Sequence, residues 1–489
     1  MDPVEIELKF QVPAAQRERL RRAVATSTAA TLRLQAVYAD TADQRLAAAG
    51  FALRLRQEGR HWVQTLKGRG DGLMQRLEHE VALPAQRGTP VLDPQRHAGS
   101  AAGTALAALL ADGAPLEPRY RTDIRRLWRR VKSGGATIEI AFDEGRIVAG
   151  EREVPVCEIE FELIAGAPAA LLALAERWVS RHGLWLDVRT KSERGHRLAL
   201  GLDRVPAVKA VPLPLPADST PASAFAAMLQ ATLAQALPNA AELAAGTGDA
   251  ETLHQLRVAL RRLRTALRLF ADWGADGGAA HALEQRWREP FQRLGAARDA
   301  DLLAGRLLPA LAAAGAPPLA WPPQDGGDPS AVVREPGFTL LVLQTLQLAL
   351  APPAATQAAP QPLAAALRSV LKPAWRQLLA GSADFARASI EAQHRTRKRL
   401  KRLRYATEFL LPRLPHRPAR RMLRAAERAL DALGDYNDLL VAEARLREHP
   451  APDAGTWFAL GWLAARRARS LQRAARRTQA LARLARFWP

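Results

Sequence analysis

The sequence predicts an N-terminal eight-stranded antiparallel β-barrel tunnel followed by an all-α domain of two pseudo-symmetric helical bundles. Three observations support this fold class. Charged and apolar residues alternate in short segments over the first two hundred residues, which is the period of β-strands. A proline-rich stretch from Val205 then excludes a helix. Beyond it, apolar residues recur at spacings of three and four, as in α-helices, and one basic segment occurs twice.

The first strand is predicted at residues 5–9. Glu5, Glu7 and Lys9 share one face of this strand, while Ile6 and Leu8 share the other. A half-exposed amphipathic strand would show the same alternation. Burying two carboxylates and an ammonium in an apolar core would be costly, so a wet, charged cavity explains the pattern better. Carboxylate oxygens suit a hard cation such as Mg²⁺, and a lysine suits a phosphate oxygen.

The same alternation recurs in later segments, which together with the segment around Tyr38 gives eight predicted strands. A closed barrel explains a repeated charged face, because interior positions alternate along every strand. The apolar outer face then needs a cover, which we expect from helices at Ala14–Ala25 and Ala169–His182. The recurring charged or polar positions are Arg54 and Arg56; Thr65 and Lys67; Arg76, Glu78 and Glu80; Arg119, Arg121, Asp123 and Arg125; Glu139 and Asp143; and Glu158, Glu160 and Glu162.

Composition and chain organisation narrow the protein class. The 489 residues carry a formal charge of +21, which favours a polyanionic partner. The single cysteine, Cys157, excludes an intramolecular disulfide and a thiolate metal cluster. The chain starts directly in a strand, so we expect no signal peptide, and the apolar window Leu340–Ala351 is too short to span a bilayer. We therefore expect a cytoplasmic protein with no membrane partner.

We predict a tunnel domain at residues 1–203, a proline-rich linker at 204–221 and a helical domain at 222–489. The helical domain contains two repeats, at about 222–335 and 363–489, with loops predicted at 315–337 and 352–362. The repeats are recognised by HQLRVALRRLRT at 254–265, which aligns with HRTRKRLKRLRY at 394–405 at a constant offset of 140 residues.

Each repeated helix carries a stripe of positive charge. His254, Arg257, Arg261 and Arg264 match His394, Arg397, Lys401 and Arg404, and spacings of three and four keep each set on one face. A solvated helix face is the simplest alternative, since arginine is a good helix former. However, like charges at these spacings destabilise a helix by a few tenths of a kcal/mol per pair, about 0.2–0.5. Two such stripes therefore indicate a bound polyanion.

The first two hundred residues resemble the CYTH family of triphosphate tunnel enzymes, which includes class IV adenylate cyclases and thiamine triphosphatases. The similar segments are EIELK at 5–9, LRLRQEG at 53–59, QTLKG at 64–68, EIEFEL at 158–163 and TKSERG at 190–195. The resemblance implies that basic side chains in an eight-stranded tunnel bind a triphosphate. It also implies a divalent metal, Mg²⁺ or Mn²⁺, held by acidic side chains.

Carried over by position, the resemblance implies metal ligands at Glu5, Glu7, Asp143, Glu158, Glu160 and Glu162, without deciding which of the last three bind the ion. It implies phosphate contacts at Lys9, Arg54, Arg56, Lys67, Arg76, Arg121, Lys191 and Arg194. Two catalytic roles are expected. Lys191 would act as a donor to the leaving phosphate, and Glu80 is a candidate general base.

Residues from about 220 to 489 resemble a CHAD domain, the conserved-histidine α-helical domain often fused behind CYTH. The resemblance rests on the paired basic helices and on the segments RDAD at 298–301 and DYND at 435–438. It implies binding of inorganic polyphosphate in a basic pore between the two bundles. The candidate residues are His254, Arg257, Arg261, Arg262, Arg264, His394, Arg397, Lys398, Lys401, Arg402 and Arg404.

The predicted function is metal-dependent hydrolysis of inorganic triphosphate in the tunnel, with polyphosphate binding by the helical domain. Adenylate cyclase, thiamine or nucleoside triphosphatase and a non-catalytic polyphosphate scaffold are the alternatives. Nucleic-acid binding is less favoured, because the basic helices are poor in aromatic residues, with only Tyr405 close by. We expect no specific nucleic-acid partner. Oligomeric state, native metal and the preferred triphosphate are left open.

Overall fold

The computed structural model describes residues 4–70, 74–84, 86, 88–319, 321, 327–351, 362–448 and 452–488. The chain divides into two compact units that do not follow chain order. The first unit contains the strands and consists of Met1–Val208, Leu233–Leu256 and Ser330–Leu350. The second consists of Lys209–Thr232, Arg257–Pro329 and Ala351–Pro489. The predicted boundaries at 203 and 221 thus remain a sequence-based division, whereas packing assigns two helical segments to the strand-containing unit.

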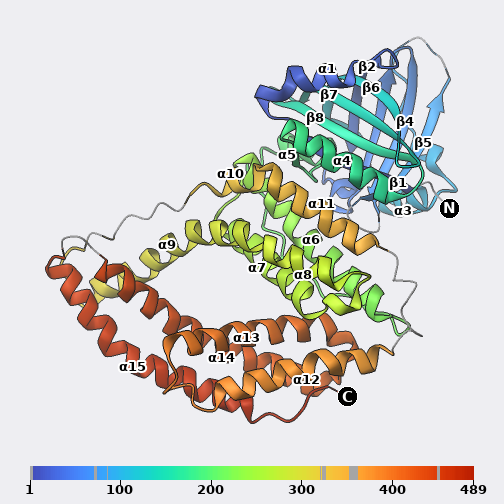
Figure 1. The fold of residues 1–489 in the computed structure, drawn as a ribbon. Helices are drawn as coiled ribbons and strands as arrows, with labels where there is room; N and C mark the ends of the chain where they lie inside the picture. The colour runs from blue at the N-terminus through green and yellow to red at the C-terminus, as the bar shows by residue number, and fades with distance from the viewer. Residues whose placement is uncertain are drawn as a thin grey trace. The chain divides into compact units, whose positions relative to one another are not determined.

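The strands form a closed antiparallel barrel, as the sequence predicts (Figure 1). Among the described residues, the order of the sheet is β5-β4-β3-β2-β6-β7-β8-β1-β9, and an additional β1–β5 pairing closes the first eight strands. The short ninth strand, which pairs with β1, was not expected. The strands are β1 (Val4–Gln11), β2 (Ala30–Asp40), β3 (Ala52–Glu58), β4 (His61–Arg69), β5 (Gln75–Leu83), β6 (Glu117–Ser133), β7 (Ala136–Ala149), β8 (Arg152–Ala165) and β9 (Trp185–Leu186).

Helices cover the apolar outer face of the barrel. The predicted segment at 14–25 forms a 3₁₀ turn, Ala14–Gln16, followed by α1, Arg17–Val24. The segment predicted at 169–182 is α4, Pro168–His182, which buries Leu171 and Leu172. The other helices of this part of the chain are α2 (Arg45–Ala48), α3 (Ala101–Leu109) and α5 (Lys191–Leu200).

Helix α5 begins with a capping box that fixes the start of the helix. The Thr190 side chain accepts a hydrogen bond from the backbone N–H of Glu193 at 2.9 Å, and the Glu193 carboxylate accepts one from the Thr190 N–H at 2.8 Å. The helix ends at Gly201, whose φ of 66° lies in the left-handed region that favours glycine. The capping box therefore fixes the position of Lys191, the first residue of the helix.

Beyond residue 220 the described chain is helical, as predicted. Residues 202–220 form neither helix nor strand. The loop predicted at 315–337 is wrong in part, because α10 begins inside it, with Pro329 in the first turn, where a missing N–H costs nothing. The helices are α6 (Pro221–Ala245), α7 (Ala250–Leu269), α8 (Gly277–Arg286), α9 (Arg288–Ala313), α10 (Pro329–Arg334), α11 (Pro336–Leu350), α12 (Leu363–Ser382), α13 (Ile390–Leu410), α14 (His416–Arg447) and α15 (Ala454–Ala482).

None of the helices in the described ranges is long and apolar enough to cross a membrane. Most of the loop predicted at 352–362 lies outside the described residues.

Replacing Gly145 with alanine should destabilise the barrel by about 1–3 kcal/mol, the usual cost of overpacking. A Cβ at this position would lie 2.0 Å from the carbonyl oxygen of Asp123 and 2.9 Å from the Cα of Ile124, and neither backbone atom can rotate away. Thermal unfolding followed by circular dichroism measures the effect. Gly434→Ala is the control, because a Cβ there meets no described atom within 4 Å. Unchanged stability of Gly145→Ala would contradict the close β6–β7 approach.

Candidate active site

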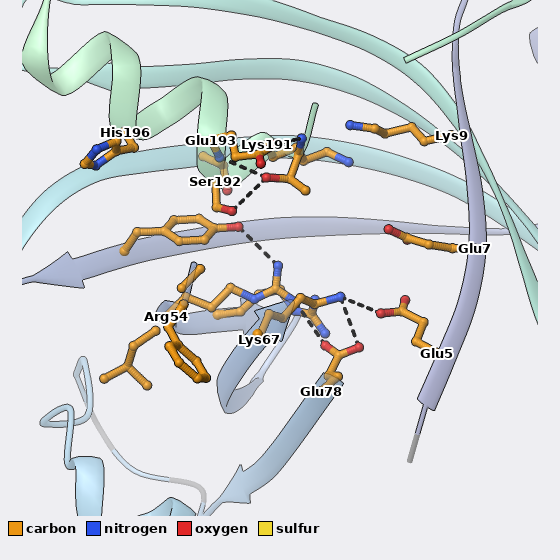
Figure 2. Close-up of a pocket in the computed structure, with 18 of the residues that line it drawn as sticks. Glu5, Glu7, Lys9, Arg54, Lys67, Glu78, Lys191, Ser192, Glu193 and His196 are labelled. Carbon is orange, nitrogen blue, oxygen red and sulfur yellow. Dashed lines mark hydrogen bonds and ion pairs between the residues drawn. The ribbon is translucent and has the colours of Figure 1, made fainter. Parts of the chain in front are cut away.

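The barrel encloses a cavity of about 530 Å³ whose lining is predominantly charged (Figure 2). Strand alternation turns residues at alternate positions of β1–β8 toward this cavity, and the first turns of α5 contribute Lys191, Ser192, Glu193 and His196. The sequence-predicted residues that line it are Glu5, Glu7, Lys9, Arg54, Arg56, Lys67, Glu80, Asp143, Glu160, Glu162 and Lys191. Side chains from distant parts of the sequence thus share one small volume.

A row of three carboxylates crosses the barrel wall, and we call it the acidic row. Glu7 of β1 lies directly opposite Glu162 of β8, and Glu162 lies directly opposite Glu139 of β7. Glu5 adds a further carboxylate on the same face of β1. Like charges directly opposite each other destabilise a sheet. The acidic row therefore indicates a place where a cation is favoured.

Lys67 is a half-buried basic residue that contacts the carboxylates at this end of the cavity. Its ammonium lies 2.9 Å from Glu5 and 3.0 Å from Glu78 (Figure 2). Burial, together with Glu5 and Glu139, raises the pKa of Glu162 to about 7. Burial also raises the pKa of Glu5, against the opposing effect of Lys67.

The Arg130 guanidinium, exposed at its end of β6, also lies 3.2 Å from Glu139. The raised pKa values indicate that Lys67 and Arg130 together do not neutralise the carboxylates. Hard divalent ions prefer carboxylate oxygens. The donor set of Glu5, Glu7, Glu139 and Glu162 therefore fits Mg²⁺ or Mn²⁺, and Glu162 would bind such an ion with loss of its proton.

A second carboxylate group already holds cations of the protein itself. Oxygens of Asp143, Glu158 and Glu160 lie within 4.8 Å of one another, a spacing that could hold a metal ion. However, the Lys191 ammonium lies 2.7, 2.6 and 2.8 Å from these three carboxylates. Arg126 adds contacts of 2.7 Å to Asp143 and 2.5 Å to Glu160. A divalent ion would have to displace the Lys191 ammonium here.

Arg54 and Arg56 form a basic wall across the cavity from these carboxylates. Arg54 donates a hydrogen bond to the Tyr38 hydroxyl at 3.2 Å. The Nε atoms of both arginines are buried without a hydrogen-bond partner among the described residues. Burial, and then repulsion by Arg54, lowers the pKa of Arg56. The Nη atoms of these arginines lie near Glu58, Glu78 and Glu80, so the Nε–H groups are the donors left for an anion. The fork geometry of guanidinium groups suits phosphate oxygens.

Glu80, the predicted general base, is hydrogen-bonded to Arg56 of the basic wall. Its carboxylate accepts hydrogen bonds from Thr65 at 3.0 Å and from Arg56 at 3.2 Å. Burial alone would raise its pKa, but Arg56 and Arg54 outweigh burial and the pKa is lowered. A carboxylate with a lowered pKa is a weak proton acceptor. The structure thus opposes the general-base role and gives Glu80 an anchoring one.

Two predicted phosphate contacts lie outside the cavity, and a third is not described. Arg121 is exposed and is not among the residues that line the cavity. Both faces of β6 carry arginine, and charge alternation therefore did not reveal which face points inward. Arg194 instead donates to the Glu158 carboxylate at 2.9 Å and to the Pro155 carbonyl at 2.6 Å. The side chain of Arg76 lies outside the described residues.

Glu78, Glu139 and Arg126 are among the lining residues that were not selected from the sequence. Glu78 and Glu139 belong to the alternating segments that predicted the strands, so their period alone places them on the inner face. Charge alternation did not point to Arg126, since its neighbours along the inner face of β6 are the uncharged Tyr120, Thr122 and Ile124. Its role is visible only from its ion pairs.

In the second compact unit, basic side chains of α7, α9 and α13 converge. Burial lowers the pKa of Lys398, and so do Arg402, Arg288 and Arg264. Burial and then Arg268 lower the pKa of Arg402. Glu284 pairs with Arg264 at 2.7 Å and offsets part of this charge, and the positive charge that remains favours an anion. We call this set, Arg264, Arg268, Arg288, Lys398 and Arg402, the basic cluster.

The other predicted polyphosphate contacts have different surroundings. Arg262 and Arg404 both pair with Glu408, at 3.3 and 2.7 Å. Three arginines of α7 instead surround the ring of Phe291, with guanidinium carbons 5.4–5.9 Å from its centroid. These are Arg257, Arg261 and Arg264. On α13, His394 is exposed, whereas Arg397 and Lys401 are half-buried; His254 lies on α7.

Comparison with known protein families matches both halves of this architecture. A model of the CYTH domain matches residues 4–195, and a model of the CHAD domain matches residues 227–447. The chain is a CYTH–CHAD protein. The CYTH match contains the barrel with its acidic row and basic wall, and the CHAD match contains α7 and α13 with the basic cluster.

A curated relative is the inorganic triphosphatase of Haemophilus influenzae, 30% identical over 200 residues. The alignment covers 40% of this chain and 54% of the relative, so the chain matches about half of that protein's length. Among solved structures, the CHAD domain from the plant Ricinus communis is 29% identical, with a TM-score of 0.46, over 57% of this chain and 98% of that one. A candidate adenylyl cyclase from Hippeastrum with a dominant triphosphatase activity is 20% identical, with a TM-score of 0.28, over 39% of this chain and 95% of that one.

The raised pKa of Glu162 predicts a pH-dependent stability. The protonated carboxyl stabilises the folded CYTH domain fully below pH 4.5, its ordinary pKa, and this contribution is lost as pH rises through about 7. Without divalent ions, the melting temperature of Glu162→Gln should therefore fall less than that of the wild type between pH 5 and 8. Mn²⁺ at pH 8 should stabilise the wild type more than the variant. Differential scanning calorimetry tests both, and parallel pH curves would contradict the assignment.

Proposed function

We propose that the CYTH domain hydrolyses inorganic triphosphate to pyrophosphate and phosphate with the help of Mg²⁺ or Mn²⁺. One observation carries this proposal: a single cavity contains a set of carboxylates that favours a divalent cation and, across from it, buried guanidinium donors that favour an anion. Phosphoryl transfer needs both kinds of site at close range. The inorganic triphosphatase named for the relative from Haemophilus influenzae supports the same reaction class.

The described residues suggest a division of roles. Arg54 and Arg56 would bind phosphate oxygens with their unsatisfied Nε–H groups, and Lys67 would add a point charge. A metal at Glu5, Glu7, Glu139 and Glu162 would supply charge neutralisation and a positioned water. Lys191 is flanked by three carboxylates that, against the opposing effect of burial, raise its pKa well above the ordinary value. It therefore acts as a fixed positive charge toward the leaving phosphate rather than as a proton donor.

The cavity favours a substrate without a large organic group over ATP or thiamine triphosphate. Its two tyrosines, Tyr38 and Tyr120, stack on each other with ring centroids 4.6 Å apart at an interplanar angle of 17°. Each thus covers one face of the other, and Tyr38 is further occupied by Arg54. Stacking of a nucleobase or thiamine ring on the covered faces would need this pair to separate. The adenylate cyclase and organic triphosphatase alternatives are therefore less favoured.

Glu7→Gln should lower kcat for inorganic triphosphate by about a hundredfold or more, because a carboxylate of the acidic row is lost without a change in volume. The matched control is Glu153→Gln, which removes an exposed carboxylate of β8 that pairs with Arg146 at the surface. Phosphate release is measured with triphosphate, ATP and thiamine triphosphate, each with Mg²⁺ or Mn²⁺. Activity that survives EDTA, or cyclic AMP formed faster than phosphate, would overturn the proposal.

We further propose that the CHAD domain binds inorganic polyphosphate at the basic cluster. Support comes from the lowered pKa values of Lys398 and Arg402, which mark charges that repel one another until an anion binds. A nucleic acid is less favoured, because the aromatic rings near the stripes, Phe291 and Tyr405, are already contacted by arginines. This role needs no reaction and is independent of the tunnel.

The double variant Lys398→Gln/Arg402→Gln in the full-length chain should weaken the binding of long-chain polyphosphate by about tenfold or more at moderate salt and should reduce the salt dependence, with a slope smaller by about one unit per lost contact. The control, Arg424→Gln/Arg428→Gln, removes the same charge from exposed positions of α14. Isothermal titration calorimetry at several salt concentrations measures both. Equal losses in the two variants, or tighter binding of duplex DNA, would contradict a polyphosphate site here.

A further inference from the structure

A buried carboxylate of the helical segment reaches the tunnel domain. Glu242 of α6 is only 5% exposed, and it lies in the stretch Leu233–Leu256 that packs into the same compact unit as the barrel. It belongs to the CHAD match rather than to the CYTH match. Burying a carboxylate costs several kcal/mol, about 2–7 even for a neutral polar group, unless partners compensate.

Two arginines of the tunnel domain supply those partners. The Glu242 carboxylate accepts a hydrogen bond from Arg197 of α5 at 2.5 Å, and the Arg189 guanidinium lies 3.9 Å away. Its other oxygen accepts a hydrogen bond from the Thr247 hydroxyl at 2.7 Å. Charge-assisted bonds of this kind are the strongest that side chains make. Glu242 therefore ties together two points of the tunnel domain that lie on either side of Lys191.

The segment between these two points carries groups of the candidate active site. Lys191 begins α5 and reaches its three carboxylates in the cavity. The backbone carbonyl of Arg189 accepts a hydrogen bond from the Lys9 ammonium. The Arg189 guanidinium also pairs with Asp187 at 2.8 Å, and Asp187 accepts a hydrogen bond from Gln11 of β1 at 3.0 Å. The two cavity lysines thus share one supporting segment.

The same segment is anchored at its beginning by other helical residues of this unit. The backbone N–H of Leu186 donates to the Thr339 hydroxyl of α11 at 3.1 Å. Arg334 of α10 lies over the Trp185 ring, 5.8 Å from its centroid, and donates to the Ala244 carbonyl of α6 at 2.7 Å. The segment is therefore attached to CHAD-matched residues at both ends, with Glu242 the charged attachment.

We propose that Glu242 is a positioning residue for the tunnel: by bridging Arg189 and Arg197, it fixes the segment that presents the Lys9 and Lys191 ammonium groups to the phosphate substrate. This inference rests on the proposed triphosphatase function. Displacing a catalytic group by about 1 Å can cost about a hundredfold in rate. A residue of the CHAD match thereby sets the geometry of chemistry performed in the CYTH domain.

The test compares Glu242→Gln with Glu443→Gln. Glu443 is a matched control, because it is 7% exposed and also bridges two arginines, Arg447 at 2.7 Å and Arg467 at 2.8 Å. Glu242→Gln should lower kcat for triphosphate by about tenfold, a partial misplacement on the scale above, with Mn²⁺ affinity unchanged. Arg197→Gln, at a less buried position, should have the same effect, and the double variant should lose little more.

Hydrogen exchange of the backbone amides of residues 187–197 provides a readout that does not need turnover. These amides should exchange faster in Glu242→Gln than in the wild type or in Glu443→Gln. A wild type without triphosphatase activity would refute the proposed function, while this exchange measurement would still test the bridging role. Unchanged exchange of the segment, or a kcat as high as that of Glu443→Gln, would overturn the proposal for Glu242.

Discussion

The pairing of β1 with β5 is the constraint on which the rest of the structure depends. It places Glu5 opposite Arg76 and closes the eight strands into a barrel. An open sheet could turn its charged face to solvent, but a closed one must place every second side chain of each strand in the same enclosed volume. Charged side chains that would be solvated on an open sheet must then be balanced by opposite charges at short range, because water screens charges poorly inside the barrel.

The balance is met differently at three places. Asp143, Glu158 and Glu160 are paired with the three cationic side chains Lys191, Arg126 and Arg194, and this group is saturated. At the acidic row and Glu5, carboxylates outnumber the nearby cations Lys67 and Arg130 among the described residues. At the basic wall, the buried Nε–H groups of Arg54 and Arg56 have no hydrogen-bond partner among the described residues. The balanced group holds Lys191 as a fixed positive charge, whereas the excess carboxylates favour a cation and the unsatisfied Nε–H groups favour an anion.

The two helical repeats also differ in how well their charges are balanced at equivalent positions. At the offset of 140 residues, Arg262 of the first repeat corresponds to Arg402 of the second. Glu408 of the second repeat corresponds to Arg268 of the first. Arg262 and Glu408 form an ion pair at 3.3 Å, whereas Arg268 lowers the pKa of Arg402. One half of the pseudo-twofold arrangement is thus neutralised within the protein, and the other retains excess positive charge. Exchange of one acidic residue for a basic one between the repeats thus turns an ion pair into a pair of like charges.

The sequence by itself determined the features that depend on neighbouring residues along one strand or helix. The alternation in Glu5–Lys9 and at Arg54, Arg56 and Lys67 predicted a charged barrel interior, and these side chains do line the cavity, because side-chain direction in a strand has a period of two. The two basic helices and their repeat were likewise predicted from the spacing of residues along a single helix.

Only the tertiary structure decided which residues meet. The inward face of β6, with Arg126 rather than Arg121, follows from its register with β2 and β7, and both faces of that strand carry arginine. The engagement of Asp143, Glu158 and Glu160 by Lys191, and of Arg197 by Glu242, joins residues more than thirty positions apart in the chain. Such contacts depend on how strands pair and helices pack, and a local period of two or of three and four carries no information about either.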